Sequence, residues 1–266
     1  MGDQSVLIFS ETGKIKEDGM KVVYSEEYKQ VYSYDPASNP GRIESIEFAL
    51  AGKVDYVEPQ PASEEDIAAV HTSRHIAEVR REGVYEIAAL AAGGAIKAAE
   101  IGLSEPCFAV IRPPGHHASA DTAWGFCYFN NMAIALTKLK KADKIKKAFI
   151  LDFDLHVGDG NINILGGEGY VAILNPASQD RNEYLKTVNN ALIKTDADMI
   201  AVSAGFDNHE ADWGGLLKTE DYTEMGQWVR EAARRNAGGC FGILEGGYNH
   251  TVLGKNVWAF MEGLSG

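Results

Sequence analysis

The chain has 266 residues, of which 45% are hydrophobic and 24% are charged, and its formal net charge is −13. This composition is typical of a folded globular protein and excludes a chain that is disordered throughout. The negative charge argues against nucleic-acid binding, which needs a basic surface, and it is compatible with a cationic substrate.

No apolar run reaches the length needed to cross a membrane, and the N-terminal run SVLIF is too short for a secretory signal. We therefore expect a cytoplasmic protein that does not contact membranes. The three cysteines, Cys107, Cys127 and Cys240, are odd in number and have apolar neighbours. This pattern favours reduced core residues over a disulfide framework.

Short apolar runs alternate with helical patterns along the chain. In chain order we predict strands at 6–10 and 55–59, helices at 63–83 and 85–102, a strand at 107–112, a helix at 130–142, a strand at 147–154, a helix at 182–195, a strand at 199–205, a helix at 220–236, a strand at 240–246 and a helix at 250–263. Ser63 is the expected N-cap of the first helix, with Asp66 in the capping-box position. The Gly93–Gly94 pair predicts close packing of the second helix against a neighbour.

Strands that are almost wholly apolar and are each followed by a helix indicate a parallel sheet covered on both faces. The chain has no proline- or serine-rich linker, no internal repeat and no low-complexity tract. We therefore predict a single domain over residues 1–266, with a three-layer α/β/α architecture around a central parallel sheet.

Four predicted strands end in polar, glycine-rich loops. Their sequences are IRPPGHHA at 111–118, DFDLHVGDG at 152–160, SAGFDNHE at 203–210 and LEGGYNH at 244–250. Ligands of open α/β sheets bind beyond the carboxyl ends of the strands. These four loops therefore predict one common site.

The loop at 152–160 predicts a metal ion. Side chains alternate along a strand, so Asp152, Asp154 and His156 are expected to project to one face, and burying neighbouring carboxylates is costly unless a cation compensates. Asp154 and His156 can reach one ion, and Asp207 can supply a third ligand. Such a set leaves a position for water, as catalytic sites do. Taken alone, DFDLH fits an N-cap aspartate and a core histidine about equally well; Asp207 and a nearby histidine pair favour the metal.

That pair is His116 and His117, which follow Pro113, Pro114 and Gly115 in a constrained loop. Histidine titrates near neutrality, so a pair placed opposite a metal-bound water suits proton transfer. Asp152 and Asp159 are the unassigned carboxylates that could fix the histidine tautomers, which makes two His–Asp dyads possible.

Tyr248 lies in a loop whose glycines allow close approach to the site, and its hydroxyl could polarise a carbonyl. A packed aromatic cap is the alternative interpretation of this residue. A metal-bound water, a proton shuttle and a phenolic donor together describe amide hydrolysis.

Five motifs in order, RPPGHHA, GFCYFNN, LDFDLHVGDG, SAGFD and LEGGYN, resemble those of the zinc-dependent deacetylases. That family includes the histone deacetylases and the acetylpolyamine amidohydrolases and has an arginase-like fold. The resemblance covers about residues 66–250. It implies Asp154, His156 and Asp207 as Zn²⁺ ligands, although Fe²⁺ or Co²⁺ also fits this ligand set.

The resemblance also implies roles for the remaining polar residues. His117 would be the general base and acid, with His116 as its electrostatic companion, and Tyr248 would polarise the carbonyl. Asp152 would orient His116, and Asp159 would orient His117.

Residues that would contact the substrate follow from the same resemblance. Gly125 and Phe126 would line a narrow channel for an acyl-lysine-like chain, because aromatic walls suit an aliphatic stem. Trp213 falls near the rim, where it could gate the pocket or simply pack at the surface. The forms SAGFD and LEGGYN favour the class II and polyamine-deacetylase branch.

The sequence departs from the family at three points. Val157 stands where a second histidine is usual, and the segment between Asp159 and Asp207 is shorter. It lacks the Ser-Leu pair that helps to bind K⁺ in relatives, which leaves a potassium site doubtful. In the N-terminal part, NPGRIESI with Arg42 is the nearest equivalent of a family motif.

The leading hypothesis is a metal-dependent amidohydrolase that removes an acetyl group from an acetylated polyamine or an acetyl-lysine side chain. One alternative is an arginase-like ureohydrolase acting on a guanidino group, which would use two metal ions. Another is a non-catalytic binder of an acyl ligand. The family also suggests a homo-oligomer.

Overall fold

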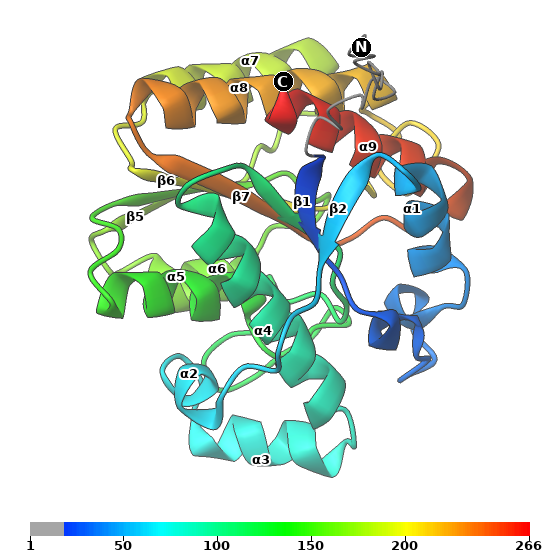
Figure 1. Ribbon diagram of the computed structural model, residues 1–266, viewed down its shortest axis with the longest axis vertical. Coiled ribbons are helices and arrows are strands. Elements are labelled where there is room, and N and C mark those ends of the chain that lie inside the picture. Colours follow the sequence, from blue (N-terminus) through cyan, green and yellow to red (C-terminus); the bar gives the residue numbers. More distant parts are fainter. Residues whose placement is uncertain (1–18) are drawn as a thin grey trace, which may run out of the picture.

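A computed structural model describes residues 19–266, and its centre is one sheet of seven parallel strands (Figure 1). The strands are β1 (Met20–Val23), β2 (Val54–Val57), β3 (Cys107–Ala109), β4 (Ala148–Asp152), β5 (Val171–Leu174), β6 (Met199–Ala204) and β7 (Gly239–Leu244). Their order across the sheet is β2-β1-β3-β7-β6-β4-β5. Every pair of neighbours is parallel, which confirms the predicted fold class.

Helices cover both faces of this sheet (Figure 1). One layer contains α4 (Tyr85–Gly102), α5 (Asn131–Lys141) and α6 (Asp159–Leu165). The other contains α1 (Arg42–Leu50), α7 (Arg181–Lys194), α8 (Thr219–Arg235) and α9 (His250–Ser265). The short helices α2 (Glu64–Ala68) and α3 (Ser73–Arg81) lie beside the first layer, and the 3₁₀ helices η1 (Glu26–Lys29) and η2 (Pro36–Ser38) join β1 to α1.

The central strands are buried along their whole length. Every residue of β4, with the sequence AFILD, and of β6, with the sequence MIAVSA, is inaccessible to solvent or nearly so. Strands that are covered on both faces have no solvent side, so their sequences are continuous apolar runs rather than alternating ones. This burial is why the carboxylate of Asp152, the last residue of β4, needs a partner inside the protein.

The helix predicted at 63–83 is two helices, and the single-helix prediction was wrong. Ser63 does cap α2, since its Oγ accepts from the Asp66 amide at 3.1 Å. Thr72 then begins α3 as a second N-cap, accepting from the His75 amide at 3.3 Å. The Thr72 amide donates to the Ala120 carbonyl at 2.8 Å, which fixes the break between the two helices.

Several short elements were missed. These are β1, α1, α6, β5 and the two 3₁₀ helices. The first residue of α1 follows Gly41, which has a φ of +85° and makes no side-chain cap, so the sequence carries no N-cap signal there. The strand predicted at 6–10 lies outside the described residues.

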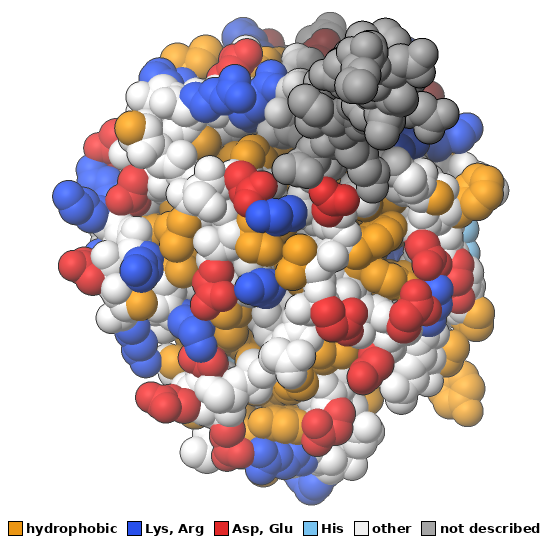
Figure 2. All heavy atoms as spheres, in the orientation of Figure 1, with side chains coloured by type: hydrophobic (Ala, Val, Ile, Leu, Met, Phe, Trp, Pro, Cys, Tyr) orange, Lys and Arg blue, Asp and Glu red, His pale blue; other side chains and the backbone are white. Residues whose placement is uncertain are grey.

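The surface mixes charges of both signs. Figure 2 shows acidic and basic side chains interspersed over the face in view, with apolar side chains between them.

Among residues 19–266, none of the helices combines the length and the apolar character that a membrane span requires.

Gly93 provides the close approach predicted for α4. A Cβ at this position would lie 1.8 Å from the carbonyl oxygen of Gln60, a backbone atom. The segment is held there because the Ala62 amide donates to the Ala89 carbonyl of α4 at 2.8 Å.

We expect Gly93→Ala to lower the free energy of unfolding by about 2 kcal/mol, because overpacking against fixed backbone outweighs the gain in helix propensity. Urea unfolding followed by circular dichroism measures this change. Gly167→Ala is the matched control, since its Cβ meets nothing within 4 Å, and we expect a change of less than about 0.5 kcal/mol. Equal stability of the two variants would contradict the packing argument.

Candidate active site

The four polar loops meet at the carboxyl ends of the strands. They follow β3, β7, β6 and β4, which are four consecutive neighbours in the sheet order. The register aligns their ends, because Asp152 of β4 pairs with Ser203 of β6, and Ser203 pairs with Ile243 of β7. The predicted common site is therefore assembled from loops that are distant in sequence.

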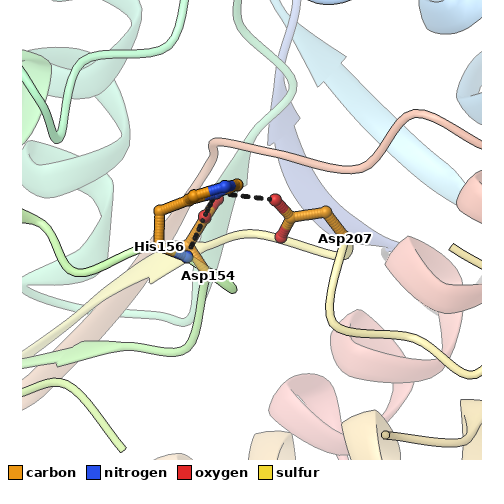
Figure 3. Close-up of side chains that lie close together, drawn as sticks. All are labelled: Asp154, His156 and Asp207. Carbon is orange, nitrogen blue, oxygen red and sulfur yellow. Dashed lines mark hydrogen bonds and ion pairs between the residues drawn. The ribbon is translucent and has the colours of Figure 1, made fainter. Parts of the chain in front are cut away.

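The three predicted ligands, Asp154, His156 and Asp207, point toward one another (Figure 3). One ligand atom from each of Asp154, His156 and Asp207 lies within 4.8 Å of the others. The His156 Nδ1 atom is 3.2 Å from Asp154 Oδ1 and 3.3 Å from Asp207 Oδ2. Two carboxylates and one imidazole form this cluster.

The sequence suggested that side-chain alternation along a strand brings these residues together. That explanation was wrong. β4 ends at Asp152, and the chain beyond it is a loop. The loop curls around the carboxylates instead: the His156 amide donates to Asp154 Oδ1 at 2.9 Å, and the Leu155 amide donates to Asp207 Oδ1 at 3.0 Å. Backbone amides thus hold two of the candidate ligands.

Two glycines make room for Asp154. A Cβ on Gly205 would lie 2.0 Å from Asp154 Oδ2, and the Gly246 amide donates to the same oxygen at 2.8 Å. A Cβ on Gly246 would lie 2.5 Å from this oxygen, so Gly205 and Gly246 are both required by close approach to a carboxylate.

The cluster holds excess negative charge in a buried place. Burial, together with the charge of Asp154, raises the pKa of Asp207 to about 6. The adjacent carboxylates of Asp154 and Asp207 raise the pKa of His156 to about 10. Asp207 Oδ2 is buried and accepts no well-formed hydrogen bond from residues 19–266; its contact is the ion pair with His156. A cation is what these atoms lack, and this donor set fits a divalent metal ion such as zinc.

His116 lies above a fully buried carboxylate. Its Nδ1 is 3.2 Å from Asp152 Oδ2, which also accepts from the Asn161 side-chain amide at 3.1 Å. Its Nε2 is 3.8 Å from Asp154 Oδ1. Burial alone would lower the pKa of His116, but the charges of Asp154 and Asp152 outweigh it and hold that pKa well above its usual range.

His117 has the opposite electrostatic environment. Burial and the positive charge of His116 lower the pKa of His117 to about 4, although its Nδ1 is 2.7 Å from Asp159 Oδ1. The hydrogen bonds from His117 and Trp124 outweigh burial and lower the pKa of Asp159. In the metal-free protein, these opposite shifts favour a charged His116 and a neutral His117 at neutral pH.

A cavity of about 100 Å³ opens above these groups, and all three predicted substrate-contact residues line it. Its lining includes His116, His117, Gly125, Phe126, His156, Trp213 and Tyr248. The Phe126 ring meets the Tyr248 ring edge-on at 5.9 Å, and Trp213 stacks on Tyr248 at 4.1 Å. Gly125 has a φ of +60°, and a Cβ there would lie 2.3 Å from the His117 ring.

Comparison with known proteins identifies the family of the chain. The model of the histone deacetylase domain matches residues 37–184 and 167–264. The chain belongs to the histone deacetylase family. This assignment confirms the resemblance of the five motifs.

Relatives in the family come from archaea, bacteria and eukaryotes. A probable deacetylase of Methanothermobacter thermautotrophicus is 30% identical over 303 residues, covering 93% of this chain and 91% of that protein. The polyamine deacetylase HDAC10 of Danio rerio is 26% identical, covering 93% of this chain and 48% of that protein. The crystal structure of the HDA15 HD domain superposes with a TM-score of 0.79 at 23% identity, covering 93% and 89% of the two chains. The structural likeness shows the arginase-like fold predicted from the motifs.

Sequence reasoning missed two residues that hold Tyr248 in this deacetylase-family site. Asp212 Oδ2 accepts from the amides of Tyr248 and Asn249 at 2.8 and 2.7 Å. Arg42, noted only as a family motif, is fully buried and donates to the Gly247 carbonyl at 2.8 Å. The only sequence signal for Arg42 was its place in the motif NPGRIESI. The only signal for Asp212 was that it precedes Trp213.

The raised pKa of His156 predicts how the metal-free protein responds to pH. Its folded pKa of about 10 exceeds the unfolded value of about 6.5, so its stabilisation is complete below about pH 6.5 and is lost as the pH rises toward 10. We expect the unfolding temperature of metal-free protein to fall more between pH 7 and pH 9 than that of His156→Gln.

Differential scanning fluorimetry with a chelator measures this difference, and Zn²⁺ should remove the excess fall in the wild type because the metal replaces the proton. Parallel pH dependence in the two metal-free proteins would refute the ion-pair argument.

Proposed function

We propose that this protein is a zinc-dependent amidohydrolase that removes an acetyl group from an amine. The observation that supports the proposal is one small cavity lined by His116, His117, Tyr248 and His156. Through His156 this cavity adjoins the candidate metal triad, whose two carboxylates lie beside that imidazole. The family to which the chain belongs, which includes a probable deacetylase of Methanothermobacter thermautotrophicus, supports a deacetylase.

Asp154, His156 and Asp207 would hold the ion in this proposal. Zn²⁺ is our choice, with Fe²⁺ or Co²⁺ as ions that the same ligands accept. When bound, the ion supplies Lewis acidity toward the acyl oxygen and lowers the pKa of water. The potassium site considered from the sequence stays a prediction.

His117 is the proposed proton carrier. With a pKa of about 4 it is neutral at pH 7, so Nε2 can accept a proton from the attacking water while Nδ1 donates to Asp159. The same Nε2 then returns the proton to the leaving amine. His116 stays protonated above Asp152 and offers positive charge to the negative charge that develops on the acyl oxygen.

Tyr248 is the proposed donor to the acyl oxygen. Burial, reinforced by the charge of Asp154, raises the pKa of the Tyr248 hydroxyl, so it keeps its proton across the physiological range. A neutral phenol aimed at a developing oxyanion stabilises it. Asp212 and Arg42 hold the turn that carries this residue.

The cavity limits what can react. A volume of about 100 Å³ suits a small acyl group on a narrow chain better than a bulky one. The aromatic rings of Phe126, Trp213 and Tyr248 suit the methylenes of a polyamine or a lysine side chain. The net charge of −13 favours a cationic amine.

Two alternatives have measurable consequences. An arginase-like ureohydrolase would bind two metal ions per chain, whereas residues 19–266 offer one group of three His, Cys, Asp or Glu ligands. A non-catalytic acyl-ligand binder would bind acetylated amines without releasing acetate. Metal analysis and turnover separate both from the deacetylase.

We expect Asp207→Asn to retain less than about a tenth of the zinc bound by wild type after gel filtration, because it removes one of three charged ligands. Inductively coupled plasma mass spectrometry measures the zinc-to-protein ratio. Asp159→Asn is the matched control, since Asp159 contacts His117 rather than the triad, and it should retain a full equivalent. A full equivalent in Asp207→Asn would overturn the ligand assignment.

We expect zinc-loaded protein to release acetate from N-acetylputrescine, N-acetylspermidine or an acetyl-lysine peptide. Tyr248→Phe should lower kcat by about 10²–10³-fold with unchanged zinc content, because it removes an oxyanion donor. A coupled acetate assay with all three substrates side by side measures both effects and ranks the substrates. Zinc-loaded wild type that hydrolyses none of them would refute acetyl-amine hydrolysis.

A further inference from the structure

We propose that Trp124 is a positioning residue that fixes the orientation of His117, directly by stacking and indirectly through Asp159. This inference rests on the proposed function of His117 as the proton carrier. Trp124 belongs to none of the motifs that predicted the site, although it immediately precedes GFCYFNN.

The hydrogen bonds of Asp159 connect the two rings. One oxygen, Oδ1, lies 2.7 Å from His117 Nδ1, and the other, Oδ2, accepts from the indole Nε1 of Trp124 at 2.8 Å. Both oxygens of a single carboxylate are therefore engaged, one by each ring. Rotation of the carboxylate would break both bonds, so Trp124 holds Asp159 in the orientation that His117 needs.

Stacking fixes the plane of the imidazole. The centroids of His117 and Trp124 are 3.8 Å apart with an angle of 29° between the rings. On another side, His116 lies 4.0 Å from His117 at 40°. Gly125 packs against the ring edge, where a Cβ would lie 2.3 Å from the Cδ2 atom. Nδ1 is engaged by Asp159, and Nε2 is the nitrogen left for the substrate.

Comparison of the two His–Asp pairs explains why His117 needs this help. Asp152, the partner of His116, is fully buried and is held by Asn161. The side chain of Asp159 is 50% exposed, so water competes for its oxygens and a bond to it is worth less. The N–H of Trp124 is a second hydrogen-bond donor to Asp159. It fixes the orientation of this exposed carboxylate, as burial does for Asp152.

The exposure of Trp124 itself argues against a packing role. It leaves 54% of its surface exposed, whereas a tryptophan kept for the core would bury most of its ring. Its ring stacks on His117, and its Nε1 donates to Asp159. The remaining alternative is that Trp124 only forms a wall of the cavity and contacts the substrate without orienting His117.

Kinetics of zinc-loaded variants separate positioning from a wall. Trp124→Phe keeps an aromatic face but removes the N–H donor, and we expect kcat to fall about tenfold with KM within about twofold. Trp258→Phe is the matched control on α9, where the ring contacts Lys53, and it should leave both constants unchanged. A rise in KM at constant kcat, or no effect in Trp124→Phe, would overturn the proposal.

The route through Asp159 has its own test. In an Asp159→Ala background, we expect Trp124→Phe to change kcat by less than about twofold, because the carboxylate that it orients is gone. An undiminished tenfold effect in that background would overturn the indirect route. Zinc content and unfolding temperature, measured on every variant, should match those of the parent protein, and their loss together with kcat would make the role structural and refute positioning.

A spectroscopic measurement keeps this proposal separate from the proposed function. ¹⁵N NMR of histidine-labelled, zinc-loaded protein reports the tautomer of His117, which Asp159 should hold with the proton on Nδ1. We expect a mixture of tautomers in Trp124→Phe and a single one in wild type and Trp258→Phe. An unchanged tautomer in Trp124→Phe would refute positioning, even if no acetylated amine were hydrolysed; a mixture would support it in the same case.

Discussion

Three buried carboxylates at the end of one sheet constrain the whole site. Asp152, Asp154 and Asp207 lie at the ends of neighbouring strands where water does not reach, and burying such charges without compensation costs several kcal/mol each. The chain compensates with backbone amides, with protonated His116, and with His156 on the open side. Asp207 Oδ2 accepts no hydrogen bond from residues 19–266, and a cation held by Asp154, His156 and Asp207 would compensate its charge.

The same charges give the histidine pair its division of labour. His116 lies close to two carboxylates and binds a proton tightly, and its positive charge then disfavours a proton on His117. Two adjacent residues of one type thus acquire opposite protonation states from their surroundings alone. A pair of equally exposed histidines would titrate together and would not hold a neutral proton carrier beside a charged companion at one pH.

Much of this arrangement could be predicted from the sequence, since apolar strand runs and the polar residues that end them are local signals. The common site of the four loops followed from those runs. The choice of Asp154, His156, Asp207, His116 and Tyr248 as candidate residues followed from the loops and from the family motifs. Elements shorter than about five residues, such as β1 and β5, gave too little periodicity to detect. The break at Thr72 escaped because a hydrogen bond to Ala120, distant in sequence, creates it.

The contacts that escaped prediction in the site share a physical cause. Trp124, Asp212 and Arg42 act on catalytic candidates through bonds between segments that no spacing relates, and Arg42 lies 206 positions before the tyrosine that it supports. Residues at strand ends inherit their position from the sheet, so their register can be read from sequence. His117 and Tyr248 lie on loops, where the sheet does not fix side-chain orientation. Each therefore depends on a carboxylate and a stacked tryptophan supplied from elsewhere in the chain. In this fold, the sheet sets where the chemistry occurs, and the loop contacts set the angles at which its groups meet the substrate.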